Sequence, residues 1–208
     1  MPYPVVVAVE PALTQRNRLT TLFRAILAIP HIILVGGAGA TIASRSNGQT
    51  SAVGEGGLLG AVAFILAVVT WFTIVFAGTQ LPIARQFTAF YLRWRVRALA
   101  YLMLLEDQYP PFGDGAYPAA LTVAEPSAPR ARLSVALRLI YAIPHAIALF
   151  FVMIGWACCT IAAWFIILIT GTYPKPLYDF AVGALRWRMR VEAYVLLMVD
   201  EYPPFSLD

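Results

Sequence analysis

One stretch of the chain occurs twice, and this internal repeat restricts the possible folds more than any other feature. Residues 19–31 read LTTLFRAILAIPH, and residues 133–145 read LSVALRLIYAIPH. A second pair of matching blocks, 71–112 and 164–205, follows in the same order. The sequence separation between equivalent residues is shorter for the second pair of blocks than for the first. The first copy therefore holds about 21 extra residues, within the Gly- and Ser-rich stretch 36–60. The fold must therefore use one structural unit twice.

Each copy contains two apolar segments long enough to cross a lipid bilayer. A membrane-spanning helix needs about 20 mainly apolar residues. In addition, 60% of the chain is apolar and 12% is charged, whereas about 25% of the residues in an average soluble domain are charged. We therefore predict an all-α integral membrane protein with four transmembrane helices, arranged as two tandem hairpins. The predicted spans are 19–43, 58–77, 133–153 and 156–170, the last two joined by a tight turn near Gly155.

The boundaries of the two units follow from the repeat and from the positions of the basic residues. The first repeat is predicted at 1–112, with an extended outer loop at 44–57, and the second repeat at 130–208. The stretch 113–129 is rich in Pro, Ala and Gly and is predicted to be a linker. Arginine clusters flank the spans on one side, which the positive-inside rule places in the cytoplasm together with both termini. Two units in the same orientation predict a pseudo-two-fold axis along the membrane normal.

Two further segments, 87–105 and 180–198, combine an apolar side with closely spaced arginines. Arginine is costly at the centre of a bilayer, and the apolar residues of 87–105 recur at helical spacing. We predict two amphipathic interfacial helices on the cytoplasmic surface, where arginine pairs with lipid phosphate and tryptophan lies at headgroup level. The same charges also suit a role that is limited to setting the topology. The predicted headgroup contacts are Arg93, Trp94, Arg95, Arg97, Arg186, Trp187, Arg188 and Arg190.

The two histidines, His31 and His145, are equivalent in the two copies, and each follows a proline inside a predicted span. One interpretation is structural, because a proline removes a helical hydrogen bond and the neighbouring histidine can satisfy the freed carbonyl. The alternatives are a proton-handling pair and a pair of axial ligands to one haem. We expect the structural role and no cofactor, with haem as the alternative.

Two acidic residues, Asp107 and Asp200, follow the arginine-rich segments at equivalent positions. Because arginines are near, we predict that these carboxylates form ion pairs at helix ends and do not act in acid–base catalysis. The sequence shows no Gly-rich phosphate loop, no metal-ligand spacing of His, Cys or Glu, and no Ser-His-Asp set. We therefore expect neither a metal site nor an enzyme.

Several motifs in combination resemble one protein family. They are the Ala-Ile-Pro-His segment, the Gly-Thr-Tyr-Pro sequence at 171–174, the Leu-Arg-Trp-Arg stretch and the closing Tyr-Pro-Pro-Phe. Together they resemble the bacterial family of domain of unknown function 4389, in two tandem copies that cover nearly the whole chain. The first copy departs from the pattern at 78–82, where Gly-Thr-Gln-Leu-Pro replaces Gly-Thr-Tyr-Pro. The resemblance implies a small multi-span membrane protein and supplies no activity, cofactor or site residue. We predict a multi-pass protein of the bacterial inner membrane.

A chain of this kind offers mainly lipid-facing and protein-facing surfaces. We predict a non-catalytic accessory or assembly subunit of a larger bacterial membrane complex, whose surface helices contact anionic membrane lipids. No nucleic-acid partner is expected, because the basic residues lie in short clusters beside apolar runs. One alternative is a small transporter or channel on the pseudo-two-fold axis. The other is a haem-binding membrane subunit, which depends on His31 and His145 alone.

Overall fold

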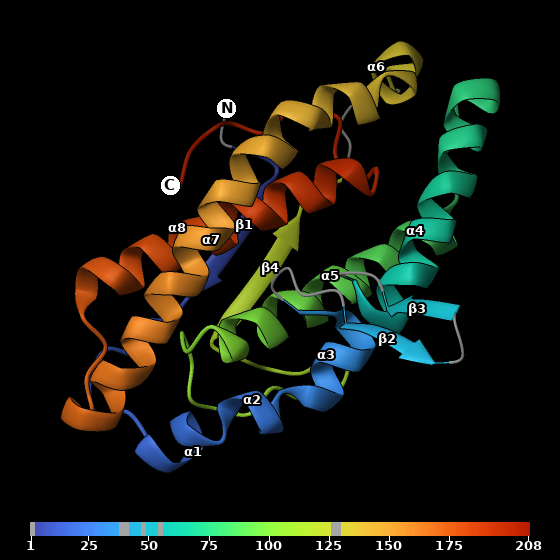
Figure 1. The fold of residues 1–208 in the computed structure, drawn as a ribbon. Coiled ribbons are helices and arrows are strands. Elements are labelled where there is room, and N and C mark those ends of the chain that lie inside the picture. The colour runs from blue at the N-terminus through green and yellow to red at the C-terminus, as the bar shows by residue number, and fades with distance from the viewer. Residues whose placement is uncertain (1–2, 38–41, 47–48, 54–55, 126–129) are drawn as a thin grey trace.

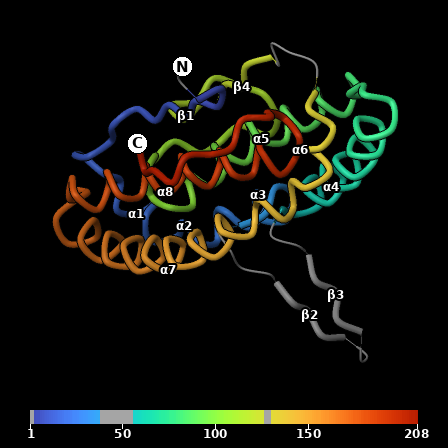
Figure 2. The backbone as a smooth tube through the Cα atoms, turned by 90° about the horizontal axis from the view of Figure 1, so that it is seen from above, coloured from blue at the N-terminus to red at the C-terminus, as the bar shows by residue number. Residues whose placement is uncertain are grey.

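The computed structural model of the chain is mostly helical and is built in three layers. It describes residues 3–37, 42–46, 49–53, 56–125 and 130–208, with 42–46 and 49–53 described as backbone only. A two-stranded ribbon forms one outer layer, two long helices form the middle, and the apolar helices form the other outer layer (Figures 1 and 2). The predominance of helix agrees with the prediction from the sequence, and the strands and the layering are new.

The ribbon pairs the beginning of the first copy with the beginning of the second. Strand β1 (Val5–Val9) and strand β4 (Ala119–Val123) are antiparallel, and buried and exposed residues alternate along both. This alternation is that of a sheet with one face on a core and one face free. The predicted linker 113–129 is therefore wrong over 119–123, where the chain is a strand, while 126–129 lies outside the described residues.

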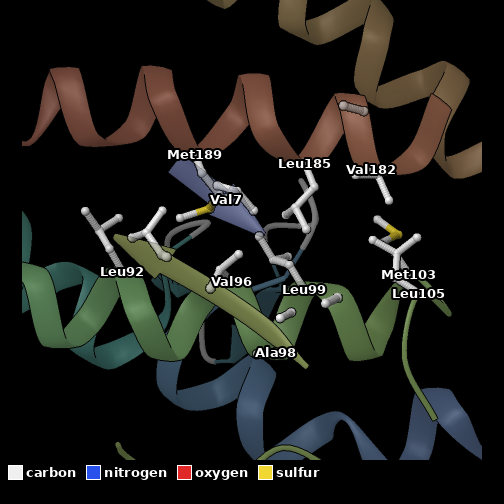
Figure 3. Close-up of a cluster of buried hydrophobic side chains, with 14 of the residues drawn as sticks. Val7, Leu92, Val96, Ala98, Leu99, Met103, Leu105, Val182, Leu185 and Met189 are labelled. Carbon is white, nitrogen blue, oxygen red and sulfur yellow. The ribbon is translucent and has the colours of Figure 1, made fainter. Parts of the chain in front are cut away.

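The middle layer consists of α5 (Pro82–Leu102) and α8 (Lys175–Val195), which contact each other and lie under the ribbon. A proline in the first turn fixes the start of each helix, where its missing N–H costs nothing. Figure 3 shows Leu92 and Leu99 of α5 facing Leu185 and Met189 of α8. The prediction of two interfacial helices in these segments is wrong in position, because both helices are buried in the interior.

The outer layer of the first copy is broken into short pieces, so the predicted span 19–43 is not one helix. Asn17 caps the first piece by accepting hydrogen bonds from the N–H groups of Leu19 and Thr20. The helical part ends at Val35, and residues 38–41 lie outside the described part. The predicted loop 44–57 overlaps a β-hairpin. The elements are α1 (Arg18–Leu22), α2 (Arg24–Leu27), α3 (Ile29–Val35), β2 (Ile42–Ser46), β3 (Gln49–Val53), α4 (Gly57–Phe72) and the π-helix η1 (Thr73–Ala77).

In the second copy the outer layer is α6 (Arg132–Ala136) followed by one continuous helix, α7 (Arg138–Thr170). The hairpin predicted from 133–153 and 156–170 is therefore wrong. Gly155 does not turn the chain, and it lies against the ring of Phe180 on α8, where a Cβ would lie 3.3 Å from that ring. The 33 residues of α7 extend over roughly 50 Å. The insertion in the first copy, with its β-hairpin, falls where α7 continues unbroken.

Reciprocal contacts show that the two copies are related by a pseudo-two-fold axis. Val7 and Leu121, which follow Tyr-Pro at the same distance in each copy, pair with each other at the centre of the ribbon. The indole N–H of Trp71 donates to the carbonyl of Val135, and that of the equivalent Trp164 donates to the carbonyl of Thr21. Such exchanged contacts are the signature of a two-fold relation. Each copy therefore completes the other, and the axis passes through the centre of the ribbon.

Candidate functional site

The outer surface of α7 is a long apolar surface that the rest of the described chain does not cover. No Asp, Glu, Lys or Arg occurs between Leu139 and Pro174. One side of α7 packs on α8 through buried residues such as Ala142, Trp156 and Ala163. The opposite side exposes large apolar residues along its whole length: Leu139, Ile140, Tyr141, Ile143, Ile147, Phe150, Phe151, Ile154, Ile161, Phe165 and Ile169.

The same surface continues over the first copy. α4 and η1 expose Leu58, Val62, Phe64, Ile65, Val68, Val69, Phe72 and Phe76, and the α1 to α3 segment exposes Leu19, Leu22, Phe23, Ile26, Leu27, Ile29 and Ile33. We call this set, together with the exposed residues of α7, the apolar face. Soluble monomers rarely expose contiguous apolar patches above a few hundred Å². The apolar face thus requires a cover of lipid or protein.

Within the residues that the structure describes, two helices are long and apolar enough to cross a membrane, namely Gly57–Ala77 and Arg138–Thr170. In their most apolar windows only 22% and 17% of the residues are buried within the protein. A core helix of a soluble protein of this length would be mostly buried. The low burial of these two helices is typical of helices whose apolar side chains contact lipid or another apolar surface.

The polar environment of α7 decides how it can lie relative to a bilayer. α8 runs along the inner side of α7 and carries Lys175, Asp179, Arg186 and Glu192. If α7 crossed the bilayer from one side to the other, these charged groups would be carried through the hydrocarbon with it, at a high cost. If the apolar face lies parallel to the membrane plane, α8 and the ribbon stay on the aqueous side.

Each copy has a buried arginine clamp at the end of its middle-layer helix. Arg24 donates to Asp107 at 2.6 Å and to the carbonyl of Glu106 at 2.5 Å, and it lies over the ring of Tyr101. In the second copy Arg138 donates to Asp200 at 2.7 Å and to the carbonyls of Tyr194 and Val199, and it lies over the ring of Tyr194. These ion pairs tie each apolar helix segment to the middle layer.

A second arginine completes each clamp. Arg16 pairs with Asp107 at 3.0 Å and Arg130 pairs with Asp200 at 3.2 Å. They also donate to the carbonyls of Leu104 and Leu197, which adopt the left-handed conformation at φ 63° and 62°. That conformation is unfavourable for leucine. The clamps therefore hold the chain in the turn that ends α5 and α8. From the sequence, these arginines are predicted to set the membrane topology. The repeat holds a signal for the clamp, because Arg16 and Arg130 are equivalent in the two copies and so are Asp107 and Asp200.

The arginines and tryptophans predicted to contact lipid headgroups are mostly in the interior. Trp94, Arg95, Arg97, Trp187 and Arg188 are buried. Their polar groups form hydrogen bonds to other residues of the protein, because α5 and α8 lie between the ribbon and the apolar helices. These five side chains cannot form a lipid-facing surface.

The remaining three of the predicted headgroup contacts are less buried, but they also bind within the protein. Arg93 forms an ion pair with Asp114 at 2.9 Å, and hydrogen bonds from Arg93 lower the pKa of that carboxyl group. Arg186 donates to the carbonyl of Val7, and Arg190 to the carbonyl of Asp208. All three lie on the side of the molecule that carries the ribbon.

A buried ion pair links the two middle-layer helices across the pseudo-two-fold axis. Arg95 donates to Glu192 at 2.8 Å and to the carbonyl of Val35, and the hydroxyl of Tyr91 donates to the same carboxylate at 2.9 Å. Because the position equivalent to Glu192 is Leu99, this contact breaks the symmetry. It joins α3, α5 and α8 at the centre of the molecule.

The two histidines lie in matching aromatic clusters, one in each copy. Nδ1 of His31 accepts a hydrogen bond from Trp94 at 3.0 Å, and its ring stacks on Phe112 at 4.6 Å between centroids. Nδ1 of His145 accepts from Trp187 at 3.2 Å, and its ring stacks on Phe205 at 3.9 Å. Within the described part of the chain neither histidine contacts the other. Each histidine joins the apolar layer to the Tyr-Pro-Pro-Phe segment of its own copy.

A cavity of about 390 Å³ opens between α5 and β4. Its polar lining includes Arg85 and Arg93, and its apolar lining includes Leu121 and Val123. Arg85 is paired with Glu125 at 3.0 Å, and Arg93 with Asp114. Both cations are therefore neutralised by carboxylates of the protein itself.

Glu106 is the one acidic side chain among the described residues that is buried. The pKa of Glu106 is raised to about 7, chiefly by burial; the charges of Glu10 and Asp107 also raise it, and Arg16 and Arg24 lower it. Its Oε1 has no hydrogen-bond partner in the described part of the chain. The second copy has Val199 at the equivalent position, so the fold accepts an uncharged side chain there.

Replacing Glu106 should change how stability depends on pH. The carboxyl group has a pKa of 4.5 when unperturbed and about 7 in the folded protein. The folded state therefore holds the proton more tightly, and stability falls as pH rises from about 4.5 to about 7. At pH 8 we expect Glu106→Gln to raise the free energy of unfolding by about 1–2 kcal/mol, with no gain near pH 4. Denaturant unfolding in detergent at both pH values measures this. The exposed control Glu125→Gln should show no such gain at pH 8, and an equal gain from both variants would contradict the assignment.

Comparison with known proteins identifies a family and no activity. The family model for a domain of unknown function, DUF4389, matches residues 56–113 and again residues 132–206. The two matches contain the two middle-layer helices and their clamp aspartates. No curated protein and no solved structure matches the chain.

Proposed function

We propose, for a chain that belongs to the DUF4389 family as two tandem copies, that it is a non-catalytic accessory or assembly subunit seated in the bacterial inner membrane. The apolar face lies in the cytoplasmic leaflet, parallel to the membrane plane, and α5, α8 and the ribbon lie on the cytoplasmic side. The observation that carries this proposal is the apolar face, which occupies one side of a three-layered molecule.

The symmetry of the molecule supports this orientation. The pseudo-two-fold axis passes through the centre of the ribbon and relates α5 to α8, so both copies present their apolar helices on the same side. An axis along the membrane normal then places all of these helices at one depth. The molecule as a whole is then amphipathic, with apolar helices on one side and charged helices behind them, and an amphipathic body of this kind binds in the plane of the interface.

The use of the polar groups supports a role without chemistry of its own. Asp107, Asp200 and Glu192 are held in ion pairs that join helices. His31 and His145 are held in aromatic clusters. Reactive side chains of an enzyme are commonly gathered in a cleft with room for a substrate, whereas these groups connect layers of the fold. What the molecule offers outward is a lipid-facing surface and a ribbon face on the opposite side.

The test of the accessory role is purification of tagged protein from its native membrane in a mild detergent, followed by mass spectrometry of co-purifying proteins. We expect a partner protein at fixed stoichiometry, whose recovery survives a salt wash. A matched variant, Val6→Glu/Thr122→Glu, changes two exposed residues of the ribbon and leaves the buried clamps intact. Loss of the partner from this variant would show that the partner binds the ribbon side. A protein that purifies alone from gently solubilised membranes would overturn the accessory role.

A further inference from the structure

Two exposed arginines lie at equivalent positions at the edge of the apolar face. Arg18 begins α1 and Arg132 begins α6. Each precedes one of the most exposed leucines of the molecule, Leu19 at 67% and Leu133 at 74%. The repeat therefore places a cation directly beside a lipid-facing side chain twice.

The guanidinium groups lie over the ends of the apolar helices of the opposite copy. Arg132 covers Gly78 at the end of η1, where a Cβ would lie 2.6 Å from Nη2 of the arginine. Arg18 covers Gly171 at the end of α7, where a Cβ would lie 3.5 Å from Nε and Nη2. Both glycines have positive φ, and each is followed by an exposed threonine. The two corners are thus built alike from both copies.

Among the arginines with described side chains, these two differ from the rest in their contacts. Arg18 and Arg132 form no hydrogen bond or ion pair with the residues that the structure describes, whereas the other arginines with described side chains all contact carbonyl or carboxylate oxygens. A guanidinium has five N–H donors in a plane. If the apolar face lies in a leaflet, as proposed, arginines at its edge lie near the depth of the lipid phosphate groups.

We infer that Arg18 and Arg132 form two equivalent binding sites for the phosphate of anionic phospholipids, one at each end of the apolar face. This inference rests on the proposed seating of the apolar face in the membrane. Arginine pairs with a phosphate through two parallel hydrogen bonds, while the adjacent leucine lies among the acyl chains. The two corners then fix the depth and the tilt of the protein in the leaflet.

The test measures binding to vesicles of phosphatidylcholine with and without phosphatidylglycerol. Wild type should bind both and prefer the anionic vesicles. The variant Arg18→Gln/Arg132→Gln should lose about 25-fold in affinity for anionic vesicles, or about fivefold for each arginine, the equivalent of about 1 kcal/mol for one basic side chain near an anionic surface. Its affinity for neutral vesicles should change little. The control Arg93→Gln/Arg186→Gln has the same charge change on the ribbon side and should retain the preference.

The possible outcomes separate the inference from the proposed function. If the double variant keeps the preference of wild type, the two sites are wrong while the seating stands. If wild type binds no vesicle, the seating itself is wrong. If wild type binds inorganic phosphate through Arg18 and Arg132 but shows no preference for anionic vesicles in phosphate-free buffer, the sites take free phosphate, and the assignment to lipid is overturned. Circular dichroism and thermal unfolding confirm that the variants are folded.

Discussion

Arg138→Met should lower the free energy of unfolding by about 3–5 kcal/mol, since removing one partner of a buried ion pair leaves the other without compensation. Arg138 is 1% exposed. It donates to Asp200, to the carbonyl of Tyr194 in the last turn of α8, and to the carbonyl of Val199 in the turn that follows. The loss should appear in chemical unfolding in detergent micelles, followed by tryptophan fluorescence. Arg24→Met, the equivalent change in the first copy, should have an effect of similar size.

Arg132→Met is the matched control, because this arginine is six positions earlier in the same copy and is exposed. Substitutions at exposed positions without partners usually change the free energy of unfolding by less than about 0.5 kcal/mol. A small effect of Arg138→Met, or an equal effect of the two variants, would show that the clamp does not hold the layers together.

Trp156→Ala should have the second large effect, again a loss of about 3–5 kcal/mol. The side chain of Trp156 is fully buried on the inner side of α7 and belongs to the main core cluster. Truncation to alanine leaves a cavity between α7 and the layers on which it packs, and its contacts with α1 and α8 resist the movement that would close it. Equilibrium unfolding in micelles measures the loss.

Phe151→Ala removes a similar aromatic group from the opposite side of the same helix. Phe151 is 66% exposed on the apolar face, so detergent or lipid fills the space that it leaves. We expect a loss below about 1 kcal/mol. If Phe151→Ala destabilised the protein as much as Trp156→Ala, then the side of α7 that carries Phe151 would also be packed against protein, which contradicts an exposed apolar face.

The sequence predicted the parts of the fold that depend on local patterns. The repeat predicted two copies related by a pseudo-two-fold axis, and the apolar runs predicted the helices of the outer layer. The extra residues of the first copy fall where predicted, around β2 and β3. These results follow because the composition of a segment and its recurrence are properties of the chain alone.

The placement of the helices could not be predicted in the same way. The arginines near Trp94 were read as exposed because an unpaired arginine is costly in an apolar interior. Arg95 is not unpaired, because it donates to the carboxylate of Glu192 and to the carbonyl of Val35. Both partners come from other parts of the chain, so the local sequence does not reveal them. Likewise, hydropathy gave no means to distinguish two short spans from one long helix across Gly155. Both errors concern contacts between segments that are distant in sequence.

The sequence does carry a signal that predicts the ribbon. Tyr3-Pro4 and Tyr117-Pro118 stand at equivalent positions, and alternating apolar residues follow each pair. Alternation of this kind predicts a half-buried strand. The second copy thus begins before the stretch that was read as its linker, and two strands related by a two-fold axis can pair with each other.

The most direct test of the account is the depth of α7 in a bilayer. Single cysteines at 143, 151, 158 and 165, the third being the native Cys158 and all in a background without other cysteines, carry a fluorescent label in reconstituted protein. Lipids with a quencher at defined acyl positions then report the depth of each label. The account predicts one similar depth, within one leaflet, for all four labels. A profile that passes from one headgroup region through the bilayer centre toward the other would show that α7 crosses the membrane and would contradict the account.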